Sequence, residues 1–529
     1  MTMELISEMA VVAPGDPVRV ELRGVDGPGD LTVLRQGDSV RTIAGAGAGL
    51  HDLGTLGAGG WGVRWTDGAS VLQAAVDVRG PDDPRMRYGF TAAYAPGLDP
   101  APLIDTARRL HLTDVQCYDW AYRHADLLGG GEDYADPLGG TISLATVRAV
   151  ARELHRVGSA ALGYAAVYAV GEEEWPRWRD GALLDAAGES VSLGDFLCIV
   201  DPAGEPWATH FSEDLAAAVA ELGFAGFHLD QYGWPKTARR ADGVVVDVAA
   251  SFASLIRRLR ADLGDIRLVF NNVNDFPTPR TAKLPQDAVY IEPWEPNSDL
   301  GSLARLADRA RRDGRGKPVV LAAYQHCYET ASVEDADLAL RFTQATLLSH
   351  GATQLIAGEG GNILTDPYYV RNRVAEASTW RILREHADFA VEYDELLLDP
   401  AVIDVTDSVT GPYNDDVDVE FEGLPVLRDA QPGTIWRRVT GAGERTVVHL
   451  IDLVDQVDTR WDAARAEPVG VRHGVLRFRR VLDARYRVRM LRPGADPVEL
   501  TAEVDGTHAR VDFSWNASPW TLLLIEVDE

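Results

Sequence analysis

The chain has 529 residues and a formal net charge of −30, and hydrophobic residues make up 46% of it. This length and composition are typical of a soluble protein with a large core and two to four domains. The negative charge argues against nucleic acid and anionic membranes as partners, because binding to phosphate groups requires a basic surface. A neutral substrate fits this charge.

The first ten residues are acidic and lack the apolar run of a secretory signal. No apolar stretch has the length needed to span a membrane. The three cysteines, Cys117, Cys198 and Cys327, are far apart in the sequence, which matches neither a metal site nor a disulfide framework. We therefore expect a cytoplasmic enzyme, or a secreted one if the start of the chain has been trimmed.

The region from about Val11 to Val78 alternates short β-type runs with glycine-rich turns. Residues 18–22 and 30–34 show the period-two pattern of half-buried strands. The run Gly45–Gly49 precedes no helix, so it lacks the context of a dinucleotide-binding loop. We predict an immunoglobulin-like β-sandwich over residues 1–82, with Pro81–Pro84 as the linker that follows it.

From Arg87 the pattern changes to strand, loop and helix in repetition. The candidate strands are Tyr88–Ala93, Asp114–Tyr118, Ala160–Val167, Gly226–Leu229, Leu268–Asn271, Val289–Glu292, Val319–Ala323 and Thr353–Ala357. Between them, Ser143–Gly158 has an N-cap serine, helical apolar spacing and a glycine stop, and further helices are expected to begin at Ser212 and Ser332.

Eight strands that alternate with helices predict a (β/α)₈ TIM barrel over residues 83–391. An open doubly wound sheet is the alternative, but it lacks the glycine fingerprint after its first strand. After about Glu392 the pattern returns to β, which predicts a C-terminal antiparallel β domain over residues 392–529. Its candidate strands are 446–451, 475–478, 486–490 and 521–525.

Two carboxylates follow apolar strand patterns. Asp230 ends the fourth candidate barrel strand and Glu292 ends the sixth, and no Lys or Arg lies between Asp214 and Gly233 to pair with Asp230. A helix cap or a distant ion pair is the structural alternative for a single carboxylate at such a position. In a barrel, however, the carboxyl ends of the strands converge on one mouth, so both side chains face one cleft. Such a pair is what cleavage of a glycosidic bond requires.

The other strand ends are rich in residues that bind sugars. Aromatic rings stack on pyranose faces, while carboxylates, amides, imidazoles and guanidinium groups bind hydroxyls. Taken singly, most such residues are structural; His228, for example, lies one pleat before Asp230 and faces the same way, as a core histidine or as a cleft residue. The candidate substrate-binding residues are Tyr118, Asp119, Trp120, Arg123, His124, Tyr164, His228, Gln231, Asn272, Trp294, Tyr324, Glu359 and Asn362.

Competing chemistries have weaker sequence support. The sequence contains no His-Glu-x-x-His motif, no cysteine pair at zinc spacing and no Gly-x-Ser-x-Gly elbow. The acidic run Asn414–Glu420 lacks the glycine and final glutamate of a calcium-binding EF-hand loop, so we expect a solvated turn there. We expect neither a metal ion nor a cofactor.

Several segments together resemble glycoside hydrolase family 66, which contains dextranases and cyclodextran-forming glucanotransferases. These segments are Tyr118–His124, Asp136–Gly140, Phe227–Gly233, Tyr290–Trp294 and Asp366–Tyr369. The resemblance covers the whole predicted barrel, and the flanking β domains fit the layout of the family. It implies that Asp230 is the nucleophile and Glu292 the general acid/base of a retaining mechanism on α-1,6-glucosidic bonds of dextran or isomalto-oligosaccharides.

The cyclising members of that family carry a carbohydrate-binding module after the seventh barrel strand. Here only Gln325–Ala331 separate that strand from Ser332, so the chain resembles the hydrolysing branch. Two alternatives remain. One is a glucanotransferase, in which a sugar intercepts the covalent intermediate. The other is a non-catalytic glucan-binding protein on the same fold, which two carboxylates at matched strand ends argue against.

Overall fold

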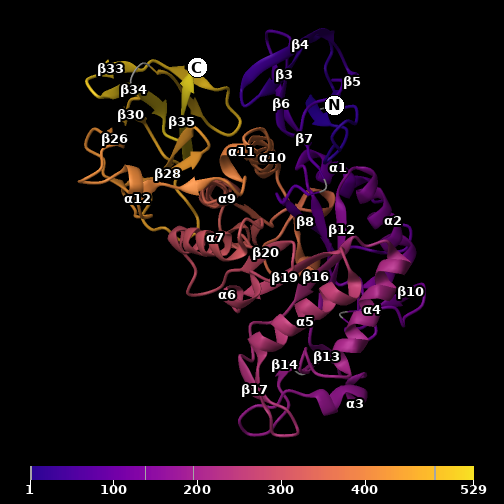
Figure 1. The fold of residues 1–529 in the computed structure, drawn as a ribbon. Coiled ribbons are helices and arrows are strands. Elements are labelled where there is room, and N and C mark those ends of the chain that lie inside the picture. Colours follow the sequence, from indigo (N-terminus) through magenta and orange to yellow (C-terminus); the bar gives the residue numbers. More distant parts are fainter. Residues whose placement is uncertain (1–2, 81, 138, 195, 482–483, 529) are drawn as a thin grey trace.

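The computed structural model describes residues 3–80, 82–137, 139–194, 196–481 and 484–528. Pro81, the first residue of the predicted linker, lies outside the described residues. Figure 1 shows the barrel in the centre, the N-terminal β domain above it in indigo and the C-terminal β domain at the upper left in orange and yellow. The predicted fold class, a barrel between two antiparallel β domains, is confirmed.

The N-terminal domain is a sandwich of two antiparallel sheets. Residues such as Leu31, Val63 and Val76 alternate with more exposed neighbours and bury their side chains between the sheets, together with Trp65. One sheet contains β1 (Glu4–Ser7), β2 (Arg19–Arg23) and β5 (Gly49–Asp52), and the other contains β4 (Asp38–Ala46), β3 (Gly29–Arg35), β6 (Gly59–Thr66) and β7 (Val71–Val78).

The barrel sheet has eight parallel strands whose spatial order follows the chain. A parallel bridge between Phe90 and Gly358 joins the first strand to the segment after the last, which closes the barrel. The strands are β8 (Tyr88–Thr91), β9 (Asp114–Cys117), β12 (Ala160–Ala166), β16 (Gly226–Asp230), β19 (Arg267–Val273), β20 (Ala288–Glu292), β21 (Val319–Leu321) and β22 (Ala352–Gln354).

Helices alternate with these strands and bury their apolar sides against them. Ser332 accepts a hydrogen bond from the Asp335 backbone and starts its helix as predicted, whereas Ser143 occupies an N-cap position without a side-chain bond. The helices are α1 (Ala101–Arg109), α2 (Leu144–Arg156), α4 (Trp207–Leu222), α5 (Val248–Leu263), α6 (Thr278–Thr281), α7 (Leu300–Gly314), α8 (Cys327–Thr330), α9 (Val333–Ser349) and α10 (Ala377–Glu392).

The predicted start of a helix at Ser212 is wrong, because α4 begins one and a half turns earlier at Trp207. Trp207 and Phe211 belong to the same buried face as Leu215, and burying this face extends the helix toward its N-terminus. The Ser212 hydroxyl instead donates to Asp262 of α5 at 2.9 Å.

Two long insertions form a lobe at the bottom of Figure 1. The insertion after β12 contains β13 (Ala169–Gly171), α3 (Trp175–Trp178), β14 (Ser192–Leu193) and β15 (Leu197–Ile199), and the insertion after β16 contains β17 (Thr237–Arg239) and β18 (Val245–Asp247). A bridge between Leu184 and Arg239 joins the two insertions. Both follow the carboxyl ends of barrel strands, so the lobe stands on the same side of the barrel as the strand ends.

The C-terminal domain contains two sheets around a second sandwich core that includes Val448, Leu476 and Val511, and their strands are antiparallel except that the short β27 (Val426–Leu427) pairs in parallel with β28. The acidic run predicted as a solvated turn is partly strand β26 (Val417–Phe421), and Asp415 and Asp416 before it pair with Arg479. The other main strands are β28 (Ile435–Ala442), β29 (Arg445–Asp452), β30 (Val471–Arg479), β31 (Arg485–Leu491), β34 (His508–Asn516) and β35 (Trp520–Asp528).

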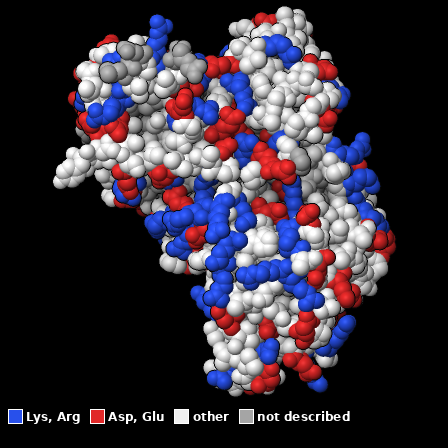
Figure 2. Space-filling view, viewed as in Figure 1, with Lys and Arg blue, Asp and Glu red and all other residues white. Residues whose placement is uncertain are grey.

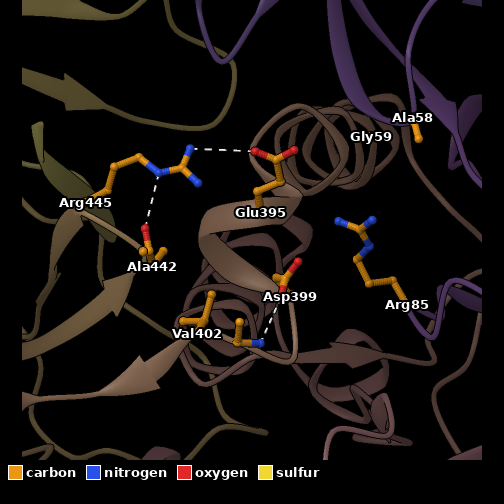
Figure 3. A pocket seen from close by; sticks show the side chains of 10 residues that line it. Ala58, Gly59, Arg85, Glu395, Asp399, Val402, Ala442 and Arg445 are labelled. Carbon is orange, nitrogen blue, oxygen red and sulfur yellow. Dashed lines mark hydrogen bonds and ion pairs between the residues drawn. The ribbon is translucent and has the colours of Figure 1, made fainter. Parts of the chain in front are cut away.

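The three domains meet around the short helix α11 (Asp394–Leu397). Glu395 of α11 pairs with Arg35 of the N-terminal domain and with Arg445 of the C-terminal domain, as Figure 3 shows for Arg445. These residues lie beside a cavity of about 250 Å³. Because its charged groups pair with one another across the domain boundary, we interpret this junction as structural.

Charge is unevenly distributed over the surface. Figure 2 shows Lys and Arg side chains gathered in the middle of the face drawn in Figure 1, over the side of the barrel where α6 and α7 lie. Helix α7 exposes Arg305, Arg309 and Arg312. Within the described residues, no helix combines the length and the apolar character that crossing a membrane would require.

Candidate active site

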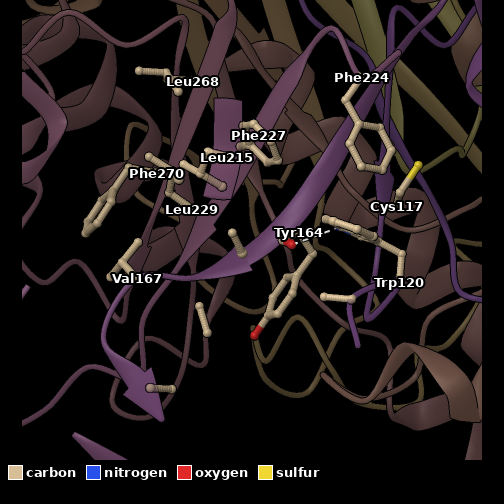
Figure 4. Close-up of a cluster of buried hydrophobic side chains, with 14 of the residues drawn as sticks. Cys117, Trp120, Tyr164, Val167, Leu215, Phe224, Phe227, Leu229, Leu268 and Phe270 are labelled. Atoms are coloured by element: carbon tan, nitrogen blue, oxygen red, sulfur yellow. Dashed lines mark hydrogen bonds between the residues drawn. The ribbon is translucent and has the colours of Figure 1, made fainter. Parts of the chain in front are cut away.

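The barrel interior has an aromatic floor beneath the strand ends. His228 stacks against Tyr164, lies edge-on to Tyr290 at 4.7 Å and has its Nδ1 3.2 Å from the hydroxyl of Tyr88. Burial lowers the pKa of His228 to about 3, so the ring is neutral. We therefore assign His228 to the floor of the site. Figure 4 shows Tyr164 extending from β12 with Trp120 beside it and Phe224 next to Trp120.

Asp230 is the last residue of β16 and is held by its two neighbouring strands. The hydroxyl of Tyr164 on β12 donates to Oδ2 at 2.8 Å, and the Nδ2 of Asn271 on β19 donates to Oδ1 at 2.7 Å. Burial raises the pKa of Asp230, while these two bonds stabilise the carboxylate and act in the opposite direction. The side chain is thus fixed with both oxygen atoms engaged.

Glu292 is the last residue of β20, on the far side of Asn271. The same Nδ2 of Asn271 donates to Glu292 Oε2 at 2.9 Å, and the side chains of Asn271, Trp294 and Tyr324 each act to lower the pKa of the carboxyl group. Burial and the negative charge of Asp230 raise the pKa of Glu292 to about 8. Glu292 is therefore mostly protonated at neutral pH.

The shared amide fixes the spacing of the two carboxyl groups. Because Asp230 Oδ1 and Glu292 Oε2 bond to one nitrogen, they are separated by no more than the sum of the two distances, about 5.6 Å. Carboxyl groups roughly 5–5.5 Å apart are typical of retaining glycosidases, and roughly 6.5–9.5 Å of inverting ones. The arrangement pairs an acid with a carboxylate, and the upper limit of about 5.6 Å lies below the inverting range.

Tyrosines surround this pair. Tyr118 stacks on Tyr369 with ring centroids 4.4 Å apart, and the hydroxyl of Tyr369 lies 3.2 Å from that of Tyr290 and 3.4 Å from that of Tyr324. The choice of candidate residues from the sequence omitted Tyr369. Its position in the Asp366–Tyr369 segment, which carried part of the family resemblance, was the available signal.

Asp119 follows β9 in the left-handed backbone region, with φ of +46°. Burial, Asp136 and Asp230 together raise its pKa to about 7. The influence of Asp230 on this pKa places Asp119 in the same electrostatic environment as the nucleophile candidate. Asp119 is thus a further titratable group of the site.

Three candidate substrate-binding residues are buried in contacts with the protein itself, so their predicted role in binding is wrong. Trp120 is completely buried against Phe224, and its indole nitrogen donates to the backbone oxygen of Tyr164. Gln231 bonds to the backbone of Asn271 and Phe276. These contacts leave no face for a sugar, so both residues support the site from behind.

Asn272 is the third correction, and the reason is the alternation of side chains along a strand. Its amide donates to the backbone oxygen of Tyr290 and its Oδ1 accepts from Thr281, outside the barrel. The preceding residue, Asn271, points inward and touches both carboxyl groups. The sequence pattern identified the correct strand and the wrong one of two adjacent asparagines.

The remaining candidates contact the loops around the mouth. Arg123 donates to the backbone oxygen of Ala135 and pairs with Glu173, so it joins the loops after β9 and β12. Burial and Arg123 lower the pKa of the neighbouring His124 to about 4. Trp294, by contrast, leaves 42% of its surface exposed beside Glu292 and is available to a ligand.

Glu359 and Asn362 lie at the seam that closes the barrel. Glu359 Oε2 accepts hydrogen bonds from Thr91 and from two backbone amides after β8, and Oε1 accepts from Asn372. The amide of Asn362 donates to Asn372 as well. These contacts explain Glu359 as a structural residue. In the described ranges, no group of three or more His, Cys, Asp or Glu side chains could hold a metal ion.

Comparison with known proteins agrees with this geometry. The model of glycosyl hydrolase family 66 matches residues 66–473, which include the barrel with both carboxylates. The chain belongs to this family. The match confirms the resemblance to family 66 that the sequence motifs indicated. Membership of the family implies a glycosidase-type enzyme that acts on glucans.

Two curated relatives are both cycloisomaltooligosaccharide glucanotransferases of Niallia circulans. One is 25% identical over 330 residues, covering 56% of this chain and 32% of the relative. The other is 25% identical over 302 residues, covering 51% and 31%. The chain thus spans about a third of the length of the curated relatives it matches.

Among solved structures, a cycloisomaltooligosaccharide glucanotransferase of Paenibacillus sp. in complex with cycloisomaltoheptaose has a TM-score of 0.88 at 18% identity, and the match covers 98% of this chain and 99% of the other. An α-L-fucosidase of Paenibacillus thiaminolyticus has a TM-score of 0.55 at 10% identity, covering 84% and 100%. At these identities the structures support the fold alone.

Proposed function

We propose that this protein is a retaining α-1,6-glucanase that acts on dextran or isomalto-oligosaccharides through a covalent glucosyl-enzyme intermediate. The observation that carries the proposal is the pair Asp230 and Glu292, held about 5.6 Å apart or closer by one amide and differing in protonation. A glucan substrate also fits the family and the glucan names of the relatives.

In the first step, Asp230 attacks the anomeric carbon of the sugar and forms a carboxylate ester with it. The bond from that carbon to the glycosidic oxygen breaks, and Glu292 gives its proton to the departing oxygen. The pKa of about 8 keeps this proton in place at neutral pH. Tyr164 and Asn271 hold both oxygens of Asp230, so one of these contacts must loosen as the ester forms.

In the second step, the ionised Glu292 takes a proton from a water molecule, which attacks the same carbon and releases Asp230. The sugar leaves with the configuration it had in the substrate. Departure of Asp230 as a carboxylate restores the charge next to Glu292 and again favours its protonated form. The enzyme returns to its starting state.

A second candidate function is transfer of the glucosyl unit to another sugar instead of water. The names of both curated relatives favour it. The short connection after β21 favours hydrolysis. The cyclising members of the family carry a carbohydrate-binding module at this place, whereas here only α8 lies between β21 and α9. Time-resolved product analysis on isomaltoheptaose separates the two: shorter linear sugars support hydrolysis, and longer or cyclic products at early times support transfer.

The retaining mechanism is tested by proton NMR of the first product. We expect the α-anomer to form first and the β-anomer to follow by mutarotation. An initial β-anomer would exclude the double displacement at Asp230. No cleavage of any α-1,6-linked oligosaccharide would exclude the proposed function.

A further inference from the structure

The loop between β29 and β30 (residues 453–470) leaves the C-terminal sandwich and lies on the barrel. Its Thr459 accepts a hydrogen bond from the Leu300 backbone at 2.8 Å, and its Trp461 backbone donates to Ser298 at 3.2 Å. Arg465 donates to the backbone of Asp335 on α9. The C-terminal domain thereby contacts the segment after β20, which ends at Glu292, and the segment after β21, which contains Tyr324.

Trp461 supports the turn that carries Trp294. Its side chain is buried, and its indole nitrogen donates to the backbone oxygen of Asn297 at 2.8 Å. The backbone of Asn297 bonds in turn to Trp294, and its side chain shares Asn274 Oδ1 with the Trp294 backbone. A continuous set of hydrogen bonds therefore runs from the C-terminal domain to the backbone of Trp294, whose indole is exposed.

Asp462 supports the neighbouring strand end. Its Oδ1 accepts from the backbone of Cys327 at 2.8 Å, next to the exposed His326, which precedes α8. Trp294 and Tyr324 lie with ring centroids 6.3 Å apart. Trp294 and His326 are both exposed and follow the neighbouring strands β20 and β21, and one loop of the C-terminal domain contacts both of their segments.

The role of Glu292 as general acid indicates which part of the substrate lies near Trp294. A general acid must touch the oxygen that it protonates, so the departing sugar lies on the Glu292 side of the cleft. A sugar acceptor occupies the same place when it attacks the intermediate, because transfer is the reverse of departure. An exposed indole and an exposed imidazole after neighbouring strands offer stacking and a hydrogen bond to such a sugar.

We infer that Trp461 and Asp462 of the C-terminal domain are positioning residues for an acceptor site formed by Trp294 and His326, and that they set how often the intermediate is captured by a sugar rather than by water. This inference rests on the proposed function and extends it. The C-terminal domain, separate in sequence from both carboxylates, then determines the balance between hydrolysis and transfer.

The test measures the partition of one intermediate. α-Isomaltosyl fluoride forms the covalent intermediate with fluoride, and not a sugar, as the leaving group. Isomaltose is then added as acceptor, and the ratio of transfer product to hydrolysis product is measured as a function of isomaltose concentration. We expect Trp461→Phe and Asp462→Ala to lower this ratio about five- to tenfold at equal isomaltose, the effect of losing one buried hydrogen bond. General loss of folded enzyme does not change the ratio, because both products come from the same intermediate.

Asp455→Ala is the matched control, because it removes a carboxylate from the same loop whose contacts, Arg472 and Val469, are within the C-terminal domain. It should keep the wild-type ratio. The inference would be overturned if both Trp461→Phe and Asp462→Ala kept the wild-type ratio. It would also be overturned if the wild type hydrolysed the fluoride without any transfer to isomaltose. If Trp461→Phe does not fold, the result for Asp462→Ala alone decides. A wild type that releases no fluoride and cleaves no isomaltotriose defeats the proposed function itself.

Discussion

Asp230 and Glu292 accept hydrogen bonds from the same nitrogen, Nδ2 of Asn271, at 2.7 and 2.9 Å. One amide therefore sets the spacing of the two carboxyl groups and stabilises the charged form of each.

Neutralising Asp230 and neutralising Glu292 should impair the activity of the enzyme in different ways. Asp230→Asn should abolish turnover of natural glucans and of α-isomaltosyl fluoride, because no ester can form. Glu292→Gln should lower kcat/KM on isomalto-oligosaccharides by about 10²–10⁴-fold and spare the release of fluoride, which needs no proton. Fluoride release and reducing-sugar assays on both variants check this. Equal behaviour of the two variants on the fluoride would contradict the assignment.

The pH dependence of kcat/KM should be bell-shaped with its basic limb near pH 8. Glu292 must be protonated in the first step, so activity falls as the pH rises through its pKa of about 8. Asp230 must be ionised, so activity falls as the pH drops through a pKa that burial raises above the usual value. With α-isomaltosyl fluoride, the pH profile of the first step should have no basic limb, because fluoride leaves without a proton from Glu292. If the basic limb were the same for isomalto-oligosaccharides and for α-isomaltosyl fluoride, Glu292 would not be the general acid.

Asn271 and Asn272 form a matched pair on one strand. Asn271→Ala removes a donor that stabilises ionised Glu292, so it should move the basic limb to higher pH as well as lower kcat. Asn272→Ala loses buried hydrogen bonds outside the barrel and should cost about 1–3 kcal/mol of unfolding free energy with the limb unchanged. Thermal unfolding and pH profiles of both variants separate these effects.

Trp120 should behave as a core residue and not as a sugar platform. Trp120→Ala empties a completely buried position and should lower the unfolding free energy by about 3–5 kcal/mol. Trp120→Phe should lower it less and leave KM for isomalto-oligosaccharides within about twofold, because no face of the ring is open to a ligand. Denaturant unfolding and steady-state kinetics are the measurements. A raised KM in a stable Trp120→Phe enzyme would return Trp120 to the binding site.

The lobe formed after β12 and β16 should favour short substrates. It stands at the carboxyl ends of two strands next to Asp230 and can close one end of the cleft. Binding energy then saturates after a few sugar units, so kcat/KM per glycosidic bond should be at least as high on isomalto-oligosaccharides as on dextran. Kinetics on isomaltotriose to isomaltoheptaose and on dextran test this. Efficiency that rises with length and is highest on the polymer would show an open cleft.

The sequence by itself determined the three-part architecture, the strands of the barrel and the two carboxylates. Period-two and helical patterns reflect burial that is local to each element, so β16 and β20 were found within two residues of their bounds, and their last residues, Asp230 and Glu292, were identified. The short β21 and β22 were predicted two to three residues too long, because the pattern continues past the last ladder hydrogen bond.

Only the tertiary structure decided which polar neighbours serve the site. Asn271 and Asn272 are equivalent in composition, and only the orientation of β19 in the closed barrel turns the first inward. Trp120 and Tyr118 are both aromatic residues near the end of β9, yet packing buries the first completely. The contact of Trp461 with Asn297 in the Trp294 turn joins residues that are 164 positions apart, and no local pattern encodes such a contact because it depends on how whole domains pack.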